Sequence, residues 1–542
     1  MARARSVEGA SSPAPLPQDA LPVRVLRRRG DVVGVRVRRS VDRAHRSRGG
    51  PTPRHRRPGV TRELSCEICV IGSGAGGSAA AATLAAAGSD VVLLEAGPHH
   101  VPSTFDQREA TMMPRLFADA GLAATRDQSI PVMSGRGLGG STVHNTGLAV
   151  PAPRAVLENW AARGGLPVSV DAFEAAQEEV LRRLGARVVD NDEINANNQV
   201  LAAGAKDRGL DFVVARHNRD RCSGCGYCMI GCAYNKKRNA LFAWLEGGVT
   251  DGLRIVVDAP VDRIIDRADG AIVRGRDLEV RAKEVVVAAS ALRTPVLLRR
   301  SGFRSRAIGG NLRLHPFAPV AALFDHRIAA WRGVPQSVLV TGGARFLQGG
   351  RGGWILMAGA AGPAATAAFV PGHGRDVAGL MARYGHLAFA GVLLHDEGHG
   401  SVRARKDGRP EIRSWPRGDD RVGLVEGIRA LAELYFAAGA REVFLPFTRR
   451  PRVGSASELD GLERLPFRPY DVTLSSVHPQ ASVPMGAGRD AAVRPDGRLR
   501  GARRVRVADG SLFPGSVGVP PQVAIMTYGM LVGQVMAAEP SR

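Results

Sequence analysis

The sequence predicts an α/β fold, on the evidence of one strand–turn–helix–strand unit and two later runs rich in β-branched residues. The unit starts with an apolar strand at residues 69–71, passes through a glycine-rich turn, and enters an alanine-rich helix at residues 78–87. A second apolar run at residues 91–94 follows. Short buried strands that alternate with helices are typical of a parallel sheet with helices on both faces. We therefore expect a doubly wound α/β domain.

The turn at residues 72–77 reads Gly-Ser-Gly-Ala-Gly-Gly and satisfies the G-x-G-x-x-G pattern. Gly72 would permit the tight turn, Gly74 would let the backbone approach a pyrophosphate, and Gly77 would let helix and strand pack closely. The helix N-terminus would offer free N–H groups to the same pyrophosphate. Glu95 ends the next strand, and its carboxylate would accept hydrogen bonds from ribose hydroxyls. The unit predicts a dinucleotide site, and the alternative is a glycine-rich turn without a ligand.

The rest of the chain continues the alternation of strands and helices. Two more strands are expected at residues 254–257 and 284–287, and two helices at residues 172–184 and 421–438. No run of eighteen apolar residues occurs, so we expect no integral membrane span.

The net charge of +23 raises the question of nucleic-acid binding. Only five of the 74 basic residues are lysine, and aromatic residues make up 5% of the chain without interleaving the basic clusters. This arginine skew, with abundant alanine, glycine and proline, is typical of GC-rich coding bias. We therefore expect no nucleic-acid partner.

Residues 1–60 differ in texture from the rest, with fifteen arginines against four acidic residues and no sustained helical or strand period. Such a segment has little apolar surface to bury, and disorder is expected. The arginine run at residues 27–29 is not followed by an apolar stretch, so we recognise no signal peptide and expect a cytoplasmic protein. An alternative is that translation starts near Val60.

Several stretches in order along the chain resemble the glucose–methanol–choline (GMC) family of FAD-dependent oxidoreductases. They are Glu95-Ala96-Gly97, Gly135 to Asn145, Val285 to Gly302, Val477-His478-Pro479, residues 495–498 and residues 507–514. The resemblance spans residues 64–537 and, within the family, is closest to cholesterol oxidase and long-chain alcohol oxidase-like members. It implies FAD as the dinucleotide.

The resemblance also implies a division of the chain into two interleaved domains. A FAD-binding (Rossmann-like) domain would comprise residues 61–150, 250–317 and 490–542. A substrate domain, with an antiparallel sheet that roofs the flavin, would comprise residues 151–249, including a Cys-rich loop at 222–237, and residues 318–489.

By the same resemblance, each remaining motif has a role in the site. Gly139 and Gly140 would let the backbone pass close to the flavin ring. Asn145 would meet the polar edge of the flavin, and Asp509 would lie near the ribityl chain and pyrophosphate. His478 would be the base that takes the hydroxyl proton while hydride leaves for the flavin. The implied substrate is an apolar long-chain or alicyclic alcohol, with oxygen or another electron acceptor.

Two positions complicate this assignment. The family usually places a second His or Asn where this chain has Pro520, so the usual partner of His478 is missing, and Gln522 is a candidate substitute. Two alternatives stay open: a dehydrogenase that passes electrons to a quinone, cytochrome or protein, and, because of Pro520, a non-redox lyase that retains FAD. His144 stands where family members with covalent FAD carry a histidine; it either attaches the flavin or is a polar lining residue.

Four of the six cysteines form the run Cys222-x-x-Cys225-x-x-Cys228-x-x-x-Cys232. This spacing matches one bacterial ferredoxin run for an iron–sulfur cluster, although Ala233 replaces the usual proline. Three interpretations are open: reduced thiols in a tight loop, a zinc or iron–sulfur site, or local disulfides.

Overall fold

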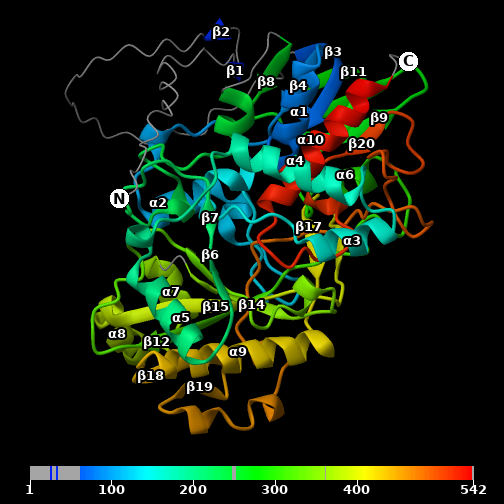
Figure 1. Ribbon diagram of the computed structural model, residues 1–542. Coiled ribbons are helices and arrows are strands. Elements are labelled where there is room, and N and C mark those ends of the chain that lie inside the picture. The colour runs from blue at the N-terminus through cyan, green and yellow to red at the C-terminus, as the bar shows by residue number, and fades with distance from the viewer. Residues whose placement is uncertain (1–24, 27–31, 34–61, 247–251, 360–361, 540–542) are drawn as a thin grey trace, which may run out of the picture.

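The computed structural model describes residues 62–246, 252–359 and 362–539, together with two short strands, β1 (Val25–Leu26) and β2 (Val32–Val33) (Figure 1). Strand β1 pairs in parallel with β8 (Leu253–Val256), and β2 pairs antiparallel with β1. Because residues 1–60 show no strand period, the sequence did not predict β1 and β2. The rest of this segment, for which the sequence predicts disorder, lies outside the described residues.

The first sheet has nine strands in the order β2-β1-β8-β4-β3-β11-β10-β9, and β20 also pairs with β11. Its remaining strands are β3 (Arg62–Ile71), β4 (Val91–Leu94), β9 (Val261–Asp266), β10 (Ala271–Gly275), β11 (Leu278–Val287) and β20 (Val505–Val507). Strands β1, β8, β4, β3, β11 and β20 pair in parallel. This pairing confirms the predicted parallel sheet, and β4, β20 and the last residues of β3 are buried as expected for strands covered on both faces.

Two helices pack against each other over this sheet: α1 (Ala75–Ala86) and α10 (Gln522–Ala538). They approach closely because glycines face the contact. A Cβ on Gly529 would lie 2.2 Å from the carbonyl oxygen of Gly76. The middle of helix α10 therefore lies against the start of α1, next to the glycine-rich turn (Figure 1).

The second sheet has seven strands in the order β19-β18-β12-β15-β14-β13-β6, and every pair in it is antiparallel. Its strands are β6 (Phe212–Val214), β12 (Phe317–Leu323), β13 (Val338–Val340), β14 (Trp354–Ala358), β15 (Leu387–Leu394), β18 (Glu442–Phe447) and β19 (Arg450–Val453). Helices α5 (Ala196–Asp207) and α9 (Asp419–Ala437) pack on it. The expected antiparallel sheet is therefore present (lower half of Figure 1).

The helices expected from the sequence lie close to their predicted bounds. Helix α4 (Val170–Arg183) begins where Ser169 caps it by accepting a hydrogen bond from the N–H of Ala172. The other helices are α2 (Glu109–Leu116), α3 (Arg154–Ala162), α6 (Thr294–Arg300), α7 (Pro363–Phe369) and α8 (Arg375–Ala382). The remaining strands are β5 (Arg187–Val188), β7 (Arg216–His217), β16 (Ser401–Ala404) and β17 (Pro410–Arg413).

Within the described parts of the chain, no helix combines the length and the apolar character needed to cross a bilayer. The cytoplasmic location expected from the sequence stays a prediction, as do the exact domain boundaries.

Candidate active site

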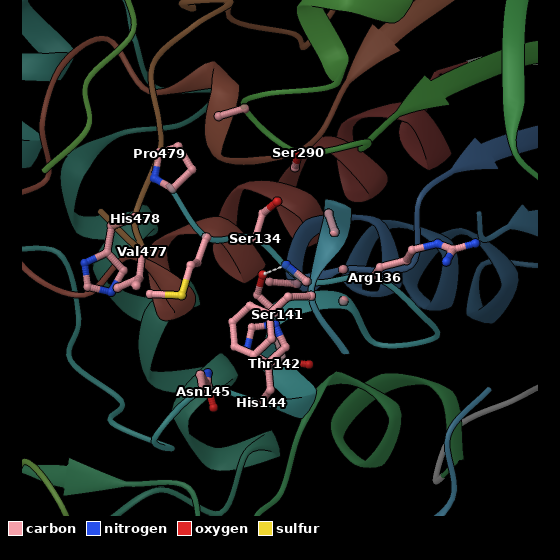
Figure 2. Close-up of a pocket in the computed structure, with 18 of the residues that line it drawn as sticks. Ser134, Arg136, Ser141, Thr142, His144, Asn145, Ser290, Val477, His478 and Pro479 are labelled. Carbon is pink, nitrogen blue, oxygen red and sulfur yellow. Dashed lines mark hydrogen bonds between the residues drawn. The ribbon is translucent and has the colours of Figure 1, made fainter. Parts of the chain in front are cut away.

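A cavity of about 900 Å³ lies between the two sheets. One end is formed by the glycine-rich turn, including Gly72 and Gly74, and the other by side chains of the second sheet, including Phe317 and Phe389. Figure 2 shows part of its wall, with His478 at the left and the segment from Ser141 to Asn145 near the centre. A cavity of this size at the carboxyl ends of parallel strands is the usual place for a ligand in an α/β protein.

The glycine-rich turn has two kinds of glycine. Gly72 adopts φ +101°, and a Cβ there would lie 2.3 Å from the carbonyl oxygen of Ala288. Likewise, a Cβ on Gly77 would lie 1.9 Å from the carbonyl oxygen of Gly72. Both are packing positions. Gly72 and Gly74 both line the cavity, but Gly74 differs because a Cβ there would meet nothing within 4 Å. The backbone at Gly74 is therefore open to a ligand.

Glu95 is buried at the end of β4, and burial raises the pKa of its carboxyl. Its Oε1 accepts hydrogen bonds from the N–H groups of Gly97 (2.8 Å) and Gly137 (3.2 Å). Its Oε2 accepts from the hydroxyl (2.7 Å) and the N–H (3.2 Å) of Ser73. The carboxylate lines the cavity as expected, but it also holds three loops together. Contact with a ribose hydroxyl stays a prediction.

Gly139 and Gly140 have different surroundings. Gly140 lines the cavity with φ +54°, and a Cβ there would lie 2.9 Å from the Cα of Gly74. Gly139 is not among the lining residues. With φ +90°, it faces the side chain of Leu241, whose Cδ1 would lie 2.3 Å from an added Cβ. Of the two, only Gly140 is placed where its backbone could contact a flavin, whereas Gly139 lacks a side chain because Leu241 packs against it.

Asp509 is buried at the cavity wall after β20, and burial raises its pKa. Its Oδ2 accepts hydrogen bonds from the N–H of Ser290 (2.8 Å) and the hydroxyl of Thr294 (2.5 Å). Its Oδ1 accepts from the N–H of Ser511 (2.8 Å). The carboxylate joins the loop that follows β11 to the loop that follows β20, and so positions both at the cavity.

His144 is buried in the cavity wall, with its ring centroid 4.0 Å from that of Phe117. Neither ring nitrogen has a hydrogen-bond partner. Burial first, and then the charge of Lys237, lower the pKa of His144 to about 3. The imidazole is therefore neutral at physiological pH.

Asn145 also lines the cavity, and its side chain is already engaged. Its Nδ2 donates to Oε1 of Gln522 (2.5 Å), and its Oδ1 accepts from the N–H of Gly147 (3.1 Å). Gln522 further donates to the carbonyl of Leu148 (3.4 Å). Gln522 thus bonds Asn145 and Leu148 in this structure, and a partnership with His478 stays a prediction.

His478 borders the cavity between Val477 and Pro479 (Figure 2). The surrounding protein lowers the pKa of His478 to about 4, and its Nδ1 is buried without a partner. The ring of His315 lies beside it, with centroids 5.2 Å apart. The structure therefore presents a neutral histidine to the cavity, with a second histidine behind it.

Two of these contacts were not predicted from the sequence. Ser73 occupies a variable position of the glycine-rich pattern, and its hydroxyl also accepts a hydrogen bond from the N–H of Gly139 (3.1 Å). The only feature of the sequence that could have pointed to Ser73 is its position directly after Gly72, the first glycine of the pattern. His315 precedes β12, far from His478 in the chain, and nothing in its local pattern signalled a site.

The four cysteines of the 222–232 run line a second, very small cavity of about 10 Å³. All six cysteines are free thiols, so no disulfide forms among them. No group of three or more Cys, His, Asp or Glu side chains in the described ranges is arranged to hold a metal ion. Arg219 is buried there instead, 3.4 Å from Sγ of Cys222 and 3.8 Å from Sγ of Cys228. The donor set does not fit a metal or cluster in this arrangement.

Comparisons with known proteins agree with this architecture. Family profiles described as GMC oxidoreductase match residues 113–317 and 396–529, and a profile described as an NAD(P)-binding Rossmann-like domain matches residues 70–111. The fold resembles pyridoxine 4-oxidase from Mesorbium loti (TM-score 0.67, 19% identity, 86% of this chain and 98% of that chain). It also resembles formate oxidase (TM-score 0.66, 16% identity, 88% and 99%).

Two sequence relatives cover most of the chain. An uncharacterised GMC-type oxidoreductase of Mycobacterium tuberculosis is 34% identical over 89% of this chain and 77% of its own length. A long-chain-alcohol oxidase of Arabidopsis thaliana is 27% identical over 87% of this chain and 68% of its own length. The fold, the family profiles and the first of these relatives lead to one conclusion: the chain is an enzyme of the GMC oxidoreductase family.

Proposed function

We propose that the protein uses FAD to oxidise the CH–OH group of an apolar alcohol. The observation that carries this proposal is one continuous cavity that joins an open glycine backbone at Gly74, a neutral histidine at His478, and an apolar end. Membership of the GMC family implies FAD as the cofactor.

The residues at the glycine end fit that cofactor. Gly74 leaves space for a group to lie against its backbone, and helix α1 begins directly after Gly74 with no side-chain cap on its first N–H groups. We infer that the turn and the helix N-terminus hold the pyrophosphate, with Glu95 and Asp509 beside it in the cavity wall. Bound FAD would supply the acceptor for the hydride that leaves the alcohol carbon.

The far end of the cavity is suited to an apolar substrate. Its lining is rich in large apolar side chains: Met113, Phe117, Met229, Ile230, Phe317, Met357, Phe369, Phe389 and Leu393. Burial of an alkyl chain against such a wall contributes about 0.8 kcal/mol per CH₂ group. An apolar long-chain or alicyclic alcohol therefore fits this end, in keeping with the long-chain-alcohol oxidases among the relatives.

His478 is the proposed base, since it combines access to the cavity with a neutral ring. A neutral imidazole can accept the hydroxyl proton as the hydride departs. Pro520 also lines the cavity, and it supplies neither a donor nor an acceptor side chain. Proton transfer in this chain therefore does not use the partner position usual in the family.

The test is an anaerobic screen of alcohols with the purified holoenzyme, in which loss of the yellow flavin colour is followed. A long-chain or alicyclic alcohol should bleach the flavin, and His478→Ala should lose about 10²-fold or more in the rate. Bleaching of His478→Ala at the wild-type rate would refute the assigned base. A chain that no alcohol bleaches would instead favour the alternative of a lyase that retains FAD.

The electron acceptor and the flavin linkage need separate measurements. Peroxide formed during turnover in air supports an oxidase, and its absence supports a dehydrogenase that passes electrons to a quinone, cytochrome or protein. His144 has two unpartnered ring nitrogens at the cavity, which is compatible with covalent attachment of FAD. Release of all colour on acid precipitation would rule that attachment out.

A further inference from the structure

The cysteine run lies around a buried guanidinium that pairs with sulfur instead of a carboxylate. Nη1 of Arg219 is 3.4 Å from Sγ of Cys222 and 3.8 Å from Sγ of Cys228. Its Nη2 donates to the carbonyl oxygen of Thr146 and contacts Nδ1 of His217 at 3.0 Å. Arg219 is only 3% exposed, and a buried charge is stable only when its surroundings compensate it. Of these four partners, the two sulfurs are the ones that can supply a negative charge.

A second buried cation faces the same loop. Nζ of Lys237 donates to the carbonyl oxygens of Val143 (2.9 Å), Asn145 (2.5 Å) and Cys228 (3.0 Å), none of which carries a net charge. Burial lowers the pKa of Lys237 to about 8, while charge on Cys228 and Cys232 acts in the opposite direction. The ammonium therefore keeps most of its charge at neutral pH. Two buried cations beside four thiols favour a negative charge on sulfur, and the thiolate is the nucleophilic form of cysteine.

Cys222 and Cys228 differ in their access to solvent. Cys222 is partly exposed, and its Sγ also accepts a hydrogen bond from the N–H of Gly224 (3.4 Å). Cys228 is buried. Gly224 and Gly226 adopt φ +65° and +80°, so the loop folds back and brings both sulfurs to the same guanidinium nitrogen. An accessible sulfur next to a buried one is the arrangement of an attacking thiol and a second thiol that resolves it.

Cys225 lies between these two cysteines in the chain but has a different environment. Burial is the main cause that raises the pKa of its thiol, and charge on Cys228 and Cys222 adds to this effect. The hydrogen bonds of Arg219 to sulfur go to Cys222 and Cys228 instead. Cys225 therefore stays a protonated thiol at neutral pH, and it serves as an internal comparison for the other two.

The same two cations join the cysteine run to the main cavity. Arg219 donates to the carbonyl of Thr146, and Lys237 donates to that of Asn145. Both Asn145 and Thr146 line the main cavity, in the segment that follows Gly140. If the sulfurs lose their charge, the buried guanidinium loses its counter-charge. The cost of an uncompensated buried cation then displaces Arg219 from the carbonyl of Thr146 and loosens this segment.

From this arrangement we propose that Cys222 and Cys228 are a thiol pair that peroxide converts to a disulfide, and that the disulfide weakens FAD binding. This pair is distinct from the proposed alcohol oxidation and is tested without it, because peroxide is added and no alcohol is needed. An enzyme that reduces oxygen would itself produce this oxidant. Its main cavity and the small sulfur-lined cavity share Tyr227 in their walls.

The chemistry balances with hydrogen peroxide as the oxidant. The Cys222 thiolate attacks one oxygen of the peroxide, the O–O bond breaks, and the products are a sulfenic acid and hydroxide. The Cys228 thiol then attacks the sulfenic sulfur, so that the S–S bond forms, the S–O bond breaks, and water leaves with the thiol proton. Two electrons pass from the two sulfurs to the peroxide. A disulfide carries no charge, so it does not compensate Arg219 as a thiolate does.

The test treats the reduced holoprotein with hydrogen peroxide and maps its cysteines by alkylation and peptide mass spectrometry. A disulfide between Cys222 and Cys228 should form, and the Kd for FAD should rise by about ten-fold, which corresponds to the loss of one hydrogen bond from a charged donor. Dithiothreitol should reverse both changes. Before oxidation, iodoacetamide should modify Cys222 about ten-fold faster than Cys66, a partly exposed thiol that contacts a backbone carbonyl rather than a cation.

Three variants separate the charge of Cys222 from its oxidation. Cys222→Ser is neutral, so its Kd for FAD should be raised by about ten-fold without peroxide and should not change when peroxide is added. Cys222→Asp keeps a negative charge beside Arg219, so its Kd should stay within about two-fold of wild type with or without peroxide. Cys225→Ser is the matched control and should behave as wild type, disulfide included. The melting temperature of each apoprotein reports whether the loop has folded.

Peroxide treatment that leaves Cys222 and Cys228 reduced would overturn the thiol pair, and a disulfide that leaves the Kd for FAD unchanged would overturn its effect on the cofactor. A ten-fold loss of FAD affinity in Cys222→Asp would show that sulfur itself, and not its charge, holds Arg219. Zinc, iron or sulfide in stoichiometric amount in the protein as isolated would also overturn the pair, because the thiols would then be ligands. None of these results depends on whether an alcohol bleaches the flavin, so the thiol pair and the proposed function fail separately.

Discussion

The open backbone at Gly74 allows a test of the pyrophosphate site that leaves the fold intact. Gly74 has φ −67° and ψ −167°, which any residue can adopt, and an added Cβ meets no atom within 4 Å. Gly74 is also the N-cap of α1, a position where serine is at least as favourable as glycine. The variant Gly74→Ser should therefore change the free energy of unfolding of the apoprotein by no more than about 0.5 kcal/mol.

The same substitution should weaken FAD binding. The new side chain enters the space where the cofactor meets the backbone, and overpacking of such a contact costs about 1–3 kcal/mol. This corresponds to a Kd for FAD raised by about 5- to 150-fold, since each 1.4 kcal/mol is a factor of ten. Titration of the deflavinated protein with FAD, followed by flavin fluorescence, measures the change.

Gly76→Ser is the matched control in the same turn. A Cβ at Gly76 would lie 2.0 Å from the carbonyl oxygen of Ala508, so the backbone must move. Here the apoprotein itself should lose about 1–3 kcal/mol of stability or more in urea unfolding. If Gly74→Ser binds FAD as tightly as wild type, the cavity above Gly74 does not hold the pyrophosphate, and the assignment of this end fails.

Three further results follow from the same geometry. Burial lowers the pKa of His478 from about 6.5 in the unfolded chain to about 4 in the folded protein, so the unfolded state takes up this proton first as the pH falls. The free energy of unfolding therefore decreases as the pH falls through this window. Between pH 7 and 5, wild type should lose about 2 kcal/mol more than His478→Gln in urea unfolding. Asp509→Asn places an amide donor against N–H donors, so the apoprotein should lose about 1–3 kcal/mol; an unchanged urea midpoint would contradict the anchoring role. Lys237 is buried and donates from Nζ to the carbonyls of Val143 and Asn145, so Lys237→Met should lower the melting temperature and loosen FAD. Lys236 is only partly buried, and Lys236→Met should do neither.

Much of the fold could be predicted from local patterns. The runs at residues 69–71 and 91–94 lie in β3 and β4, and the predicted helix at residues 421–438 is α9 almost to the residue. These elements are long or strongly patterned, and burial on both faces of a parallel strand leaves a continuous apolar run. The short strand β1 carried no such signal, because two residues that pair with an existing edge need no period of their own.

The candidate site divides in the same way. Gly74, Glu95 and His478 could be selected from the sequence, because a backbone that must approach a phosphate requires glycine, and the motif around each residue is contiguous. The sequence could not show which glycines line the cavity. Gly139 and Gly140 are neighbours in the chain, and only the structure shows that Gly139 faces Leu241 whereas Gly140 lines the cavity. Gln522 likewise pairs with Asn145, a contact that depends on where α10 begins.

The sequence by itself determined the dinucleotide unit, the family and the identity of the proposed base. Each of these is encoded within a few consecutive residues, where spacing and residue type limit the chemistry. The tertiary structure alone decided that the ring of His315 lies beside that of His478, and that the cysteine run lies around the buried side chain of Arg219. These contacts join loops remote in the chain, so the packing of the two sheets creates them and no local pattern records them.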